Sequence, residues 1–216
     1  ALGIKHGDEV ITAANTAIPT ISAIILAGAK PKLLDISDDY LINTDRLKKI
    51  ISSKTKVIIP VHLYGQPCNM DKIIPLAKKY KLKIVEDCAQ AQGAKFKNKY
   101  VGNFGDFGCF SFYPTKILGA YGDGGAITGF SEEHLNFIQS YRNYGSVSKY
   151  QHDTNGVNSR LDDIQASILD VKLRYLVNDI DERMLIASLY QKYLSNISKI
   201  ILPSQHTLSS HSWHLY

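Results

Sequence analysis

The chain has 216 residues, 44% of them hydrophobic and 21% charged, a composition that supports a packed core and excludes an intrinsically disordered protein. Its net charge of +5 comes from lysines scattered along the chain, which argues against a nucleic-acid-binding protein. The three cysteines (Cys68, Cys88 and Cys109) lack CxxC spacing, so we expect small buried side chains and no disulfide framework or metal site. No apolar run reaches the roughly 18 residues of a membrane span, and we expect a cytoplasmic protein with no membrane partner.

Strand and helix patterns alternate along the first 87 residues. The predicted strands are 9–13, 32–35, 56–60 and 83–86, and the predicted helices are 18–27, 44–51 and a helix capped by Asn69. This alternation predicts an α/β fold with a mostly parallel sheet and helices on both faces. Ligands of such sheets bind beyond the carboxyl ends of the strands, where His62 and Asp87 each follow a predicted strand.

The second half of the chain contains two further strands and three helices. The strands are predicted at 107–111 and 126–128 without an assigned order or direction, and the helices at 132–141, 161–176 and 180–193, with a polar, irregular segment at 144–157. In the helix 161–176 we expect one buried stripe, formed by Leu161, Ile164, Ile168, Val171 and Leu173. Both ends of the chain look cut, and we expect a fragment of a longer protein, with a domain boundary near 177–180 or within 203–212.

One lysine stands out in the glycine-rich stretch CFSFYPTKILGAYGDGGAI, residues 109–127. Lys116 has few charged neighbours in sequence and is placed to act as an amine nucleophile toward a carbonyl group. Asp87 ends a buried strand, where a carboxylate needs a cationic or hydrogen-bonding partner. Considered alone, Lys116 would be interpreted as a surface lysine, and Asp87 as a residue that caps a loop or a helix. Together with the glycine loop they match the needs of pyridoxal phosphate (PLP), namely a lysine, a carboxylate and phosphate donors.

Several motifs in one order resemble the DegT/DnrJ/StrS group of PLP-dependent nucleotide-sugar aminotransferases, which have fold type I. The resemblance covers essentially the whole chain and rests on GDEVITAANT, PVHLYGQPCNM, VEDCAQAQGA, FSFYPTKILGAYGDGGAI and GVNSRLDDIQASIL. It implies a three-layer αβα sandwich of the aspartate aminotransferase type. Residues 1–178 would form the large PLP-binding domain, truncated at its N-terminus, and residues 179–216 the start of a smaller C-terminal domain.

The resemblance also assigns site residues. Lys116 would bind the PLP aldehyde covalently and then act as the catalytic base, and Asp87 would keep the pyridinium nitrogen protonated. Gln90 would hydrogen-bond the 3-hydroxyl oxygen of the ring, and Ser111 would donate to the phosphate. Asn158 would reach the phosphate of the cofactor bound by a partner subunit, which makes a homodimer the expected unit. No metal site is implied.

Other interpretations of these residues stay open at this point. Ser111 could be a plain strand residue, Gln90 a surface amide and Asn158 the cap of the helix near Leu161. The family also holds the phosphate with a Gly-Thr turn at a helix start, which would lie upstream of this sequence. Ala17 stands where many relatives carry an aromatic residue that covers the ring, so no stacking residue is assigned.

The implied activity is transfer of an amino group from glutamate to a keto-sugar nucleotide. We expect a dTDP-linked 3-keto- or 4-keto-6-deoxyhexose, with C-3 slightly favoured, in amino-sugar biosynthesis for a surface polysaccharide such as the O-antigen of lipopolysaccharide. A sugar dehydratase of the same family is the nearest alternative, but that branch carries histidine where this chain has Lys116. A non-catalytic PLP-binding regulatory protein is another. The glycines do not open a helix after a first strand, which argues against a dinucleotide-binding protein.

Overall fold

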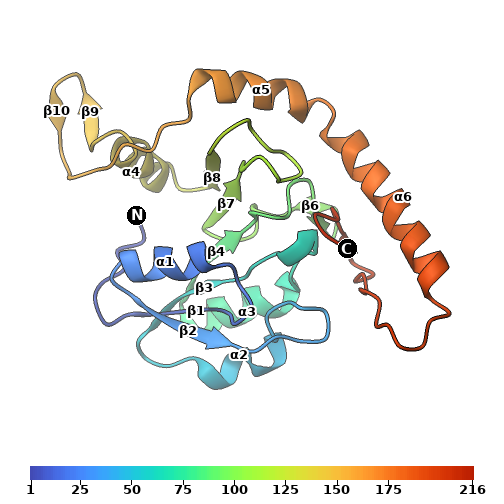
Figure 1. Cartoon of the computed structure of the whole chain (residues 1–216). Helices are drawn as coiled ribbons and strands as arrows, with labels where there is room; N and C mark the ends of the chain where they lie inside the picture. The colour runs from blue at the N-terminus through green and yellow to red at the C-terminus, as the bar shows by residue number, and fades with distance from the viewer.

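The computed structural model describes residues 1–216. Its main element is a six-stranded sheet, whose strands are drawn as arrows in Figure 1. The strands lie in the order β2-β1-β3-β4-β7-β8. The first five are parallel and β8 runs antiparallel to β7, which confirms the mostly parallel sheet. Their bounds are β1 (Glu9–Ala13), β2 (Lys30–Leu34), β3 (Thr55–Ile59), β4 (Lys83–Asp87), β7 (Phe107–Ser111) and β8 (Gly125–Gly129).

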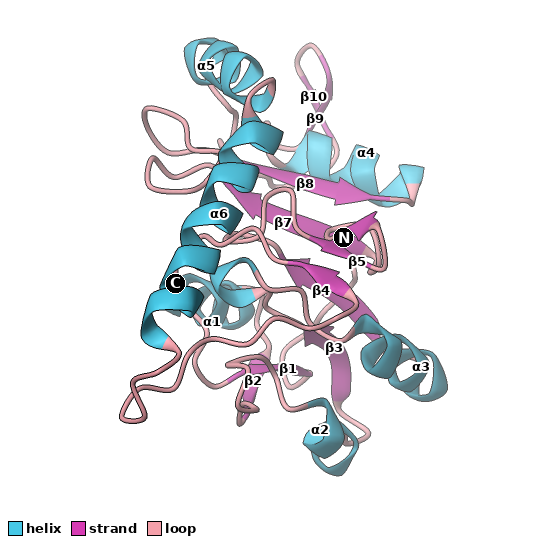
Figure 2. Cartoon of the chain, turned by 90° about the vertical axis from the view of Figure 1, so that its right-hand side faces the viewer, coloured by secondary structure: helices cyan, strands magenta, loops and turns pink.

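Three helices cover the two faces of the parallel part of the sheet. These are α1 (Ile18–Leu26) on one face, and α2 (Thr44–Ile50) and α3 (Met70–Tyr80) on the other. Successive side chains of a strand point to opposite faces. Accordingly Val10 packs with Ile24 of α1, whereas the next residue, Ile11, lies in the cluster that contains Leu47 of α2 and Ile73 of α3. The predicted three-layer α/β architecture is therefore confirmed (Figure 2).

Local capping explains where two of these helices begin. The side chain of Asn69 accepts a hydrogen bond from the backbone N–H of Lys72 at the start of α3, as the sequence predicts. Asn43 does the same for Arg46 at the start of α2. Because each cap satisfies an N–H that has no partner inside the helix, it fixes the first turn.

The region after β8 differs from the prediction in two ways. The segment expected to be irregular, residues 144–157, contains a short hairpin of β9 (Ser146–Ser148) and β10 (Gln151–His152), which follows α4 (Glu132–Tyr141). The buried stripe predicted for residues 161–176 is wrong. In α5 (Asp163–Leu173) only Leu169 is buried, while Ile164, Val171 and Leu173 are more than half exposed. The physical reason is that few residues of this helix reach the rest of the chain, with Leu169 packing against Leu118 and Ala120.

The end of the chain completes a separate three-stranded sheet, in the order β11-β5-β6. After α6 (Leu176–Leu194), β11 (Ser209–Ser210) pairs with β5 (Lys95–Phe96), which also pairs with β6 (Lys99–Tyr100). The backbone N–H groups of Ser212 and His214 then donate to carbonyls of the short helix η1 (Leu63–Gly65). The division into domains 1–178 and 179–216 stays a prediction. None of the helices combines the length and apolar character that crossing a membrane requires.

Candidate active site

A cavity of about 340 Å³ opens at the carboxyl edge of the sheet, where α/β folds bind ligands. Four of the five predicted site residues line it together: Asp87, Gln90, Ser111 and Lys116. Asp87 ends β4 and Ser111 ends β7, and these strands are neighbours in the sheet. The parallel topology thus brings together residues as far apart in the sequence as Asp87 and Lys116, which are separated by 29 positions.

Asp87 is fixed in place by hydrogen bonds to both its side chain and its backbone. Thr20 donates from Oγ1 to one carboxylate oxygen at 2.7 Å, and the backbone N–H of Ala89 donates to the other at 3.1 Å. Its backbone N–H donates to the carbonyl of Pro60, and its carbonyl accepts from the N–H of His62. A half-buried carboxylate held in this way is ready to meet a cationic group in the cavity.

Lys116 lies in the loop between β7 and β8, which is folded back on itself. The backbone N–H of Lys116 donates to the carbonyl of Tyr113 at 2.8 Å, and the N–H of Ala120 donates to the carbonyl of Phe112 at 2.8 Å. Gly119 permits this fold, because a Cβ atom there would lie 2.5 Å from the carbonyl oxygen of Pro114. The glycine-rich sequence therefore builds a tight loop that presents one amine to the cavity.

Two opposing effects act on the amine of Lys116. Desolvation lowers its pKa, while the negative charge of Asp87 acts to raise it, and the net result is a pKa below the ordinary value of 10.5. The neutral, nucleophilic amine is therefore populated at a lower pH than in a free lysine.

This shift gives a pH prediction for the protein freed of any bound aldehyde. We expect the rate of reductive methylation of Lys116 to rise with pH around a midpoint below 10.5. In the variant Asp87→Asn the midpoint of Lys116 falls further, because the charge that raises its pKa is gone. Mass spectrometry of the peptide that contains Lys116 measures this rate in both proteins, and an equal midpoint in the wild type and in Asp87→Asn would contradict the prediction.

Gln90 and Ser111 both point polar groups at the cavity. The side-chain oxygen of Gln90 accepts from the backbone N–H of Tyr64 at 2.7 Å, which leaves its NH₂ group as a donor. Ser111 Oγ accepts from the N–H of Tyr113 at 3.3 Å, so its own hydroxyl proton is available to an acceptor. Ser111 is the last residue of β7 and Gln90 is partly buried, and both line the cavity.

Asn158 lies away from this cavity. It is exposed and bridges to Asn143, and its side-chain oxygen accepts from Arg160 Nε at 3.0 Å. It is not a helix cap, because α5 begins only at Asp163 after Asp162. Arg160 also lies outside the cavity that Lys116 lines, whereas Tyr113 is part of its wall.

The residues present fit the PLP group that the sequence predicts. A planar pyridine ring needs apolar walls, and Ala17, Pro19, Val61 and Leu63 supply them. Tyr113 is the one aromatic side chain among the lining residues. The cavity also carries an amine, a carboxylate and two hydrogen-bond donors, which are the groups that the aldehyde, ring nitrogen, 3-oxygen and phosphate of PLP require.

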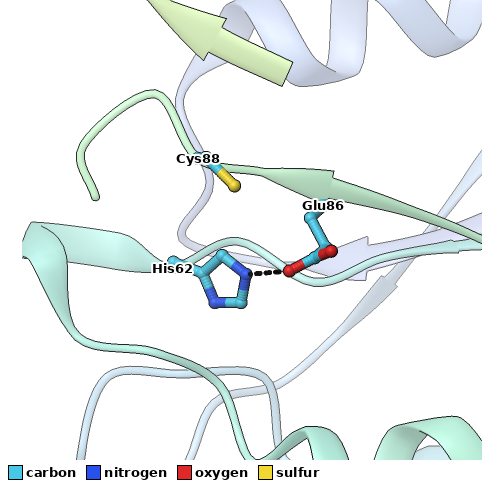
Figure 3. Close-up of side chains that lie close together, drawn as sticks. All are labelled: His62, Glu86 and Cys88. Carbon is cyan, nitrogen blue, oxygen red and sulfur yellow. Dashed lines mark hydrogen bonds and ion pairs between the residues drawn. The ribbon is translucent and has the colours of Figure 1, made fainter. Parts of the chain in front are cut away.

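A second polar cluster lies in the interior behind Asp87 and consists of His62, Glu86 and Cys88 (Figure 3). Their potential ligand atoms lie within 4.8 Å of one another. Glu86 already accepts hydrogen bonds from His62 and from the backbone N–H groups of Gly102, Phe104 and Gly105. Burial raises the pKa of the Cys88 thiol well above its usual value, which disfavours the thiolate that a metal needs. We interpret the cluster as a hydrogen-bond network and not as a metal centre.

The sequence did not point to two of the groups that shape the site. Thr20 lies 67 positions before Asp87, and the N–H of Tyr64 lies 26 positions before Gln90. A threonine in a helix and a backbone amide carry no motif, so only the fold could identify them.

The fold and the cavity define an α/β ligand-binding domain equipped for covalent chemistry with a carbonyl group. Comparison with known proteins is consistent with this class. The chain belongs to the DegT/DnrJ/EryC1/StrS aminotransferase family, which it matches along residues 1–216.

Three relatives illustrate the similarity. The chain is 48% identical to the dTDP-3-amino-3,6-dideoxy-alpha-D-galactopyranose transaminase of Aneurinibacillus thermoaerophilus, covering all of this chain and 60% of the relative. It is 42% identical to a UDP-N-acetyl-3-dehydro-alpha-D-glucosamine 3-aminotransferase of Acidithiobacillus ferrooxidans, covering all of this chain and 58% of the relative. The crystal structure of DesV from S. venezuelae superimposes with a TM-score of 0.97 at 39% identity, over all of this chain and 58% of DesV. The chain thus spans about three fifths of the length of these relatives.

Proposed function

We propose that the protein containing this chain transfers an amino group from glutamate to the keto group of a nucleotide-linked sugar, with PLP as cofactor. The observation that carries this proposal is the single cavity lined by the amine of Lys116 and the carboxylate of Asp87. The family is PLP-dependent, and the two curated relatives above are named as sugar transaminases. Both names place the amino group at C-3, which favours a 3-keto sugar over a 4-keto sugar.

Each residue of the cavity has a stated task in this proposal. Bound PLP supplies an electron sink for exchanging an amino group between an amino acid and a ketone. Lys116 Nζ would hold the cofactor through its aldehyde and would serve as the base that moves the proton. Asp87 would keep the ring nitrogen protonated, Gln90 would donate to the ring oxygen, and Ser111 would donate to the phosphate.

We further propose a homodimer in which Asn158 completes the site of the other subunit. Asn158 is exposed, and Arg160 occupies its side-chain oxygen, which leaves the amide NH₂ to donate to a phosphate. The apolar side chains exposed along α5 and α6 support an interface nearby, because a monomer gains nothing by exposing them. They include Ile164, Val171, Leu173, Val177, Leu185, Ile186 and Leu189.

Mixing two inactive variants tests the shared site. We expect Lys116→Ala and Asn158→Ala each to be weakly active or inactive as homodimers. Random mixing makes half of the dimers mixed, and each mixed dimer has one site with both Lys116 and Asn158. Activity should therefore recover to about a quarter of the wild-type value if sites are shared across a two-fold axis. No recovery after verified subunit exchange would place Asn158 outside the partner's site.

The transamination itself is tested on the full-length protein with glutamate and a panel of 3-keto and 4-keto sugar nucleotides. We expect glutamate to convert bound PLP to its amino form, seen as loss of visible absorbance, and a 3-keto dTDP-sugar to restore it. Binding of PLP without any response to glutamate would favour a regulatory protein instead. Release of a deoxygenated sugar without nitrogen would favour a dehydratase. The cytoplasmic location and the role in surface polysaccharide remain predictions from the sequence.

A further inference from the structure

The loop that contains η1 forms a hydrogen bond with Gln90, and a buried pair of residues, His62 and Glu86, stabilises this loop. We define the Tyr64 turn as residues 62–68, which lie between β3 and α3. The backbone N–H of Tyr64 donates to Gln90 Oε1 at 2.7 Å. Only the oxygen of an amide can accept from an N–H, so this bond fixes which end of the Gln90 side chain faces the cavity. The donor NH₂ group of Gln90 is thereby available to the ligand.

The backbone of Tyr64, which makes this bond, lies in the left-handed region. Its φ of 59° and ψ of 2° are unfavourable for a residue with a side chain and cost roughly 1–2 kcal/mol. Such a conformation persists where the surroundings over-determine it. The contacts of the turn with the rest of the chain should therefore include the groups that impose it.

The buried side chain of His62 provides such a contact. It has no exposed surface, and its Nδ1 accepts from the backbone N–H of Cys68 at 2.9 Å. That bond joins the first and last residues of the Tyr64 turn. Because Nδ1 accepts, the ring proton lies on Nε2, which donates to Glu86 at 3.1 Å (Figure 3).

Glu86 anchors the imidazole to the sheet. One carboxylate oxygen accepts from the N–H groups of Phe104 and Gly105 at 2.6 and 2.8 Å, and the other accepts from Gly102 at 2.8 Å as well as from His62. Burial acts to raise the pKa of Glu86, but the hydrogen bond from His62 and the backbone donors bring it below its ordinary value. The carboxylate therefore stays a hydrogen-bond acceptor for His62.

We propose that His62 is a positioning residue, whose Nδ1 closes the Tyr64 turn through Cys68 and so aims the NH₂ group of Gln90 at the ring oxygen of the cofactor. This inference rests on the proposed function, since it assigns His62 a role toward bound PLP. His62 touches neither substrate nor cofactor and acts only through the turn. A purely structural histidine would affect stability and leave the electronic state of the cofactor unchanged.

Two variants separate the two bonds of the imidazole. His62→Asn places an amide oxygen near the position of Nδ1 and keeps an acceptor for Cys68, but it loses the donor to Glu86. His62→Gln places an amide NH₂ near Nε2 and keeps the donor to Glu86, but it leaves the N–H of Cys68 without an acceptor. Each variant loses one buried hydrogen bond, so the two are matched for loss of stability.

The readout is the pH midpoint of the visible absorbance of the covalently bound cofactor, measured with PLP affinity on the full-length protein. A donor to the ring oxygen stabilises its negative charge and lowers this midpoint. Gln90→Leu removes that donor and should raise the midpoint by about one pH unit and the Kd for PLP about tenfold, as expected for one lost hydrogen bond. We expect His62→Gln to reproduce both changes and His62→Asn to stay near the wild-type midpoint.

The double variant His62→Gln/Gln90→Leu completes the test. If His62 acts through Gln90, the double variant has the same pH midpoint as Gln90→Leu alone. The reason is that Gln90→Leu has already removed the hydrogen bond that His62 positions. Additive shifts, or equal midpoints for His62→Gln and the wild type, would overturn the inference. Should His62→Gln not fold, Gly65→Ala carries the test. Its Cβ would lie 2.6 Å from Ser212 Oγ and 2.9 Å from Trp213 N, displacing the turn and raising the midpoint if the inference holds.

These outcomes are distinct from failure of the proposed function. A wild-type protein that binds no PLP, or whose bound PLP does not respond to glutamate, contradicts the proposed transamination. A wild-type protein that does both, combined with an unshifted His62→Gln variant, contradicts only the role of His62.

Discussion

Replacing Lys116 by alanine should lower the turnover rate at least about 10³-fold and abolish covalent retention of PLP. In the proposed function one amine would both hold the cofactor aldehyde and move the proton, and general base catalysis alone contributes about 10²–10⁴-fold. Steady-state kinetics with glutamate and a keto-sugar nucleotide measures the first effect. Borohydride reduction followed by peptide mass analysis measures the second, since it fixes PLP permanently on the lysine that binds it.

Lys72 supplies the matched control for this experiment. It is half exposed and forms a surface ion pair with Asp45 at 2.6 Å, an interaction worth about 0–1 kcal/mol. We expect Lys72→Ala to retain normal turnover and the same PLP adduct on the peptide of Lys116. An adduct that persists on the Lys116→Ala chain would show that another amine binds the cofactor and would refute the assignment.

Replacing Asp87 by asparagine should have the second largest effect, a fall in kcat/KM of about 10²–10³-fold, as for loss of one preorganised electrostatic group. Asparagine keeps the size of the side chain and an oxygen that can accept from Thr20, but it carries no charge to balance a protonated ring nitrogen. The measurement is kcat/KM together with the melting temperature, which separates lost chemistry from lost stability.

Two further variants provide comparisons for the loss of activity in Asp87→Asn. Thr20→Val removes the 2.7 Å hydrogen bond but leaves the charge, so we expect a loss of about tenfold, the equivalent of one hydrogen bond. Asp45→Asn removes an exposed carboxylate of the surface ion pair and should change nothing. If Asp87→Asn lost no more activity than Thr20→Val, the charge of Asp87 would not be what the reaction uses.

Much of the framework could be predicted from the sequence because it is encoded locally. Apolar runs of strand length, helical periodicity and a capping residue such as Asn69 each act within a few residues. Residues that combine a rare residue type with a strand end or a glycine loop, such as Asp87 and Lys116, could be selected for the same reason. The family could be recognised because several such motifs occur in a fixed order.

The error in α5 shows where local pattern fails. The spacing of Ile164, Val171 and Leu173 predicts a helix and an apolar face, but it does not say whether that face is covered. Burial depends on what the rest of the chain places against the helix, and here only Leu169 is buried.

The sequence by itself therefore determined the elements, the α/β class and the chemical identity of the cavity residues. The tertiary structure decided which of them share a cavity, that Thr20 anchors Asp87, and that the N–H of Tyr64 orients Gln90. It also separated Asn158 from Lys116 within one chain. The physical reason is the separation in sequence between the residues that interact. Helices and strands follow from interactions between near neighbours, whereas the cavity is assembled by strand pairing and hydrogen bonds between residues up to 67 positions apart.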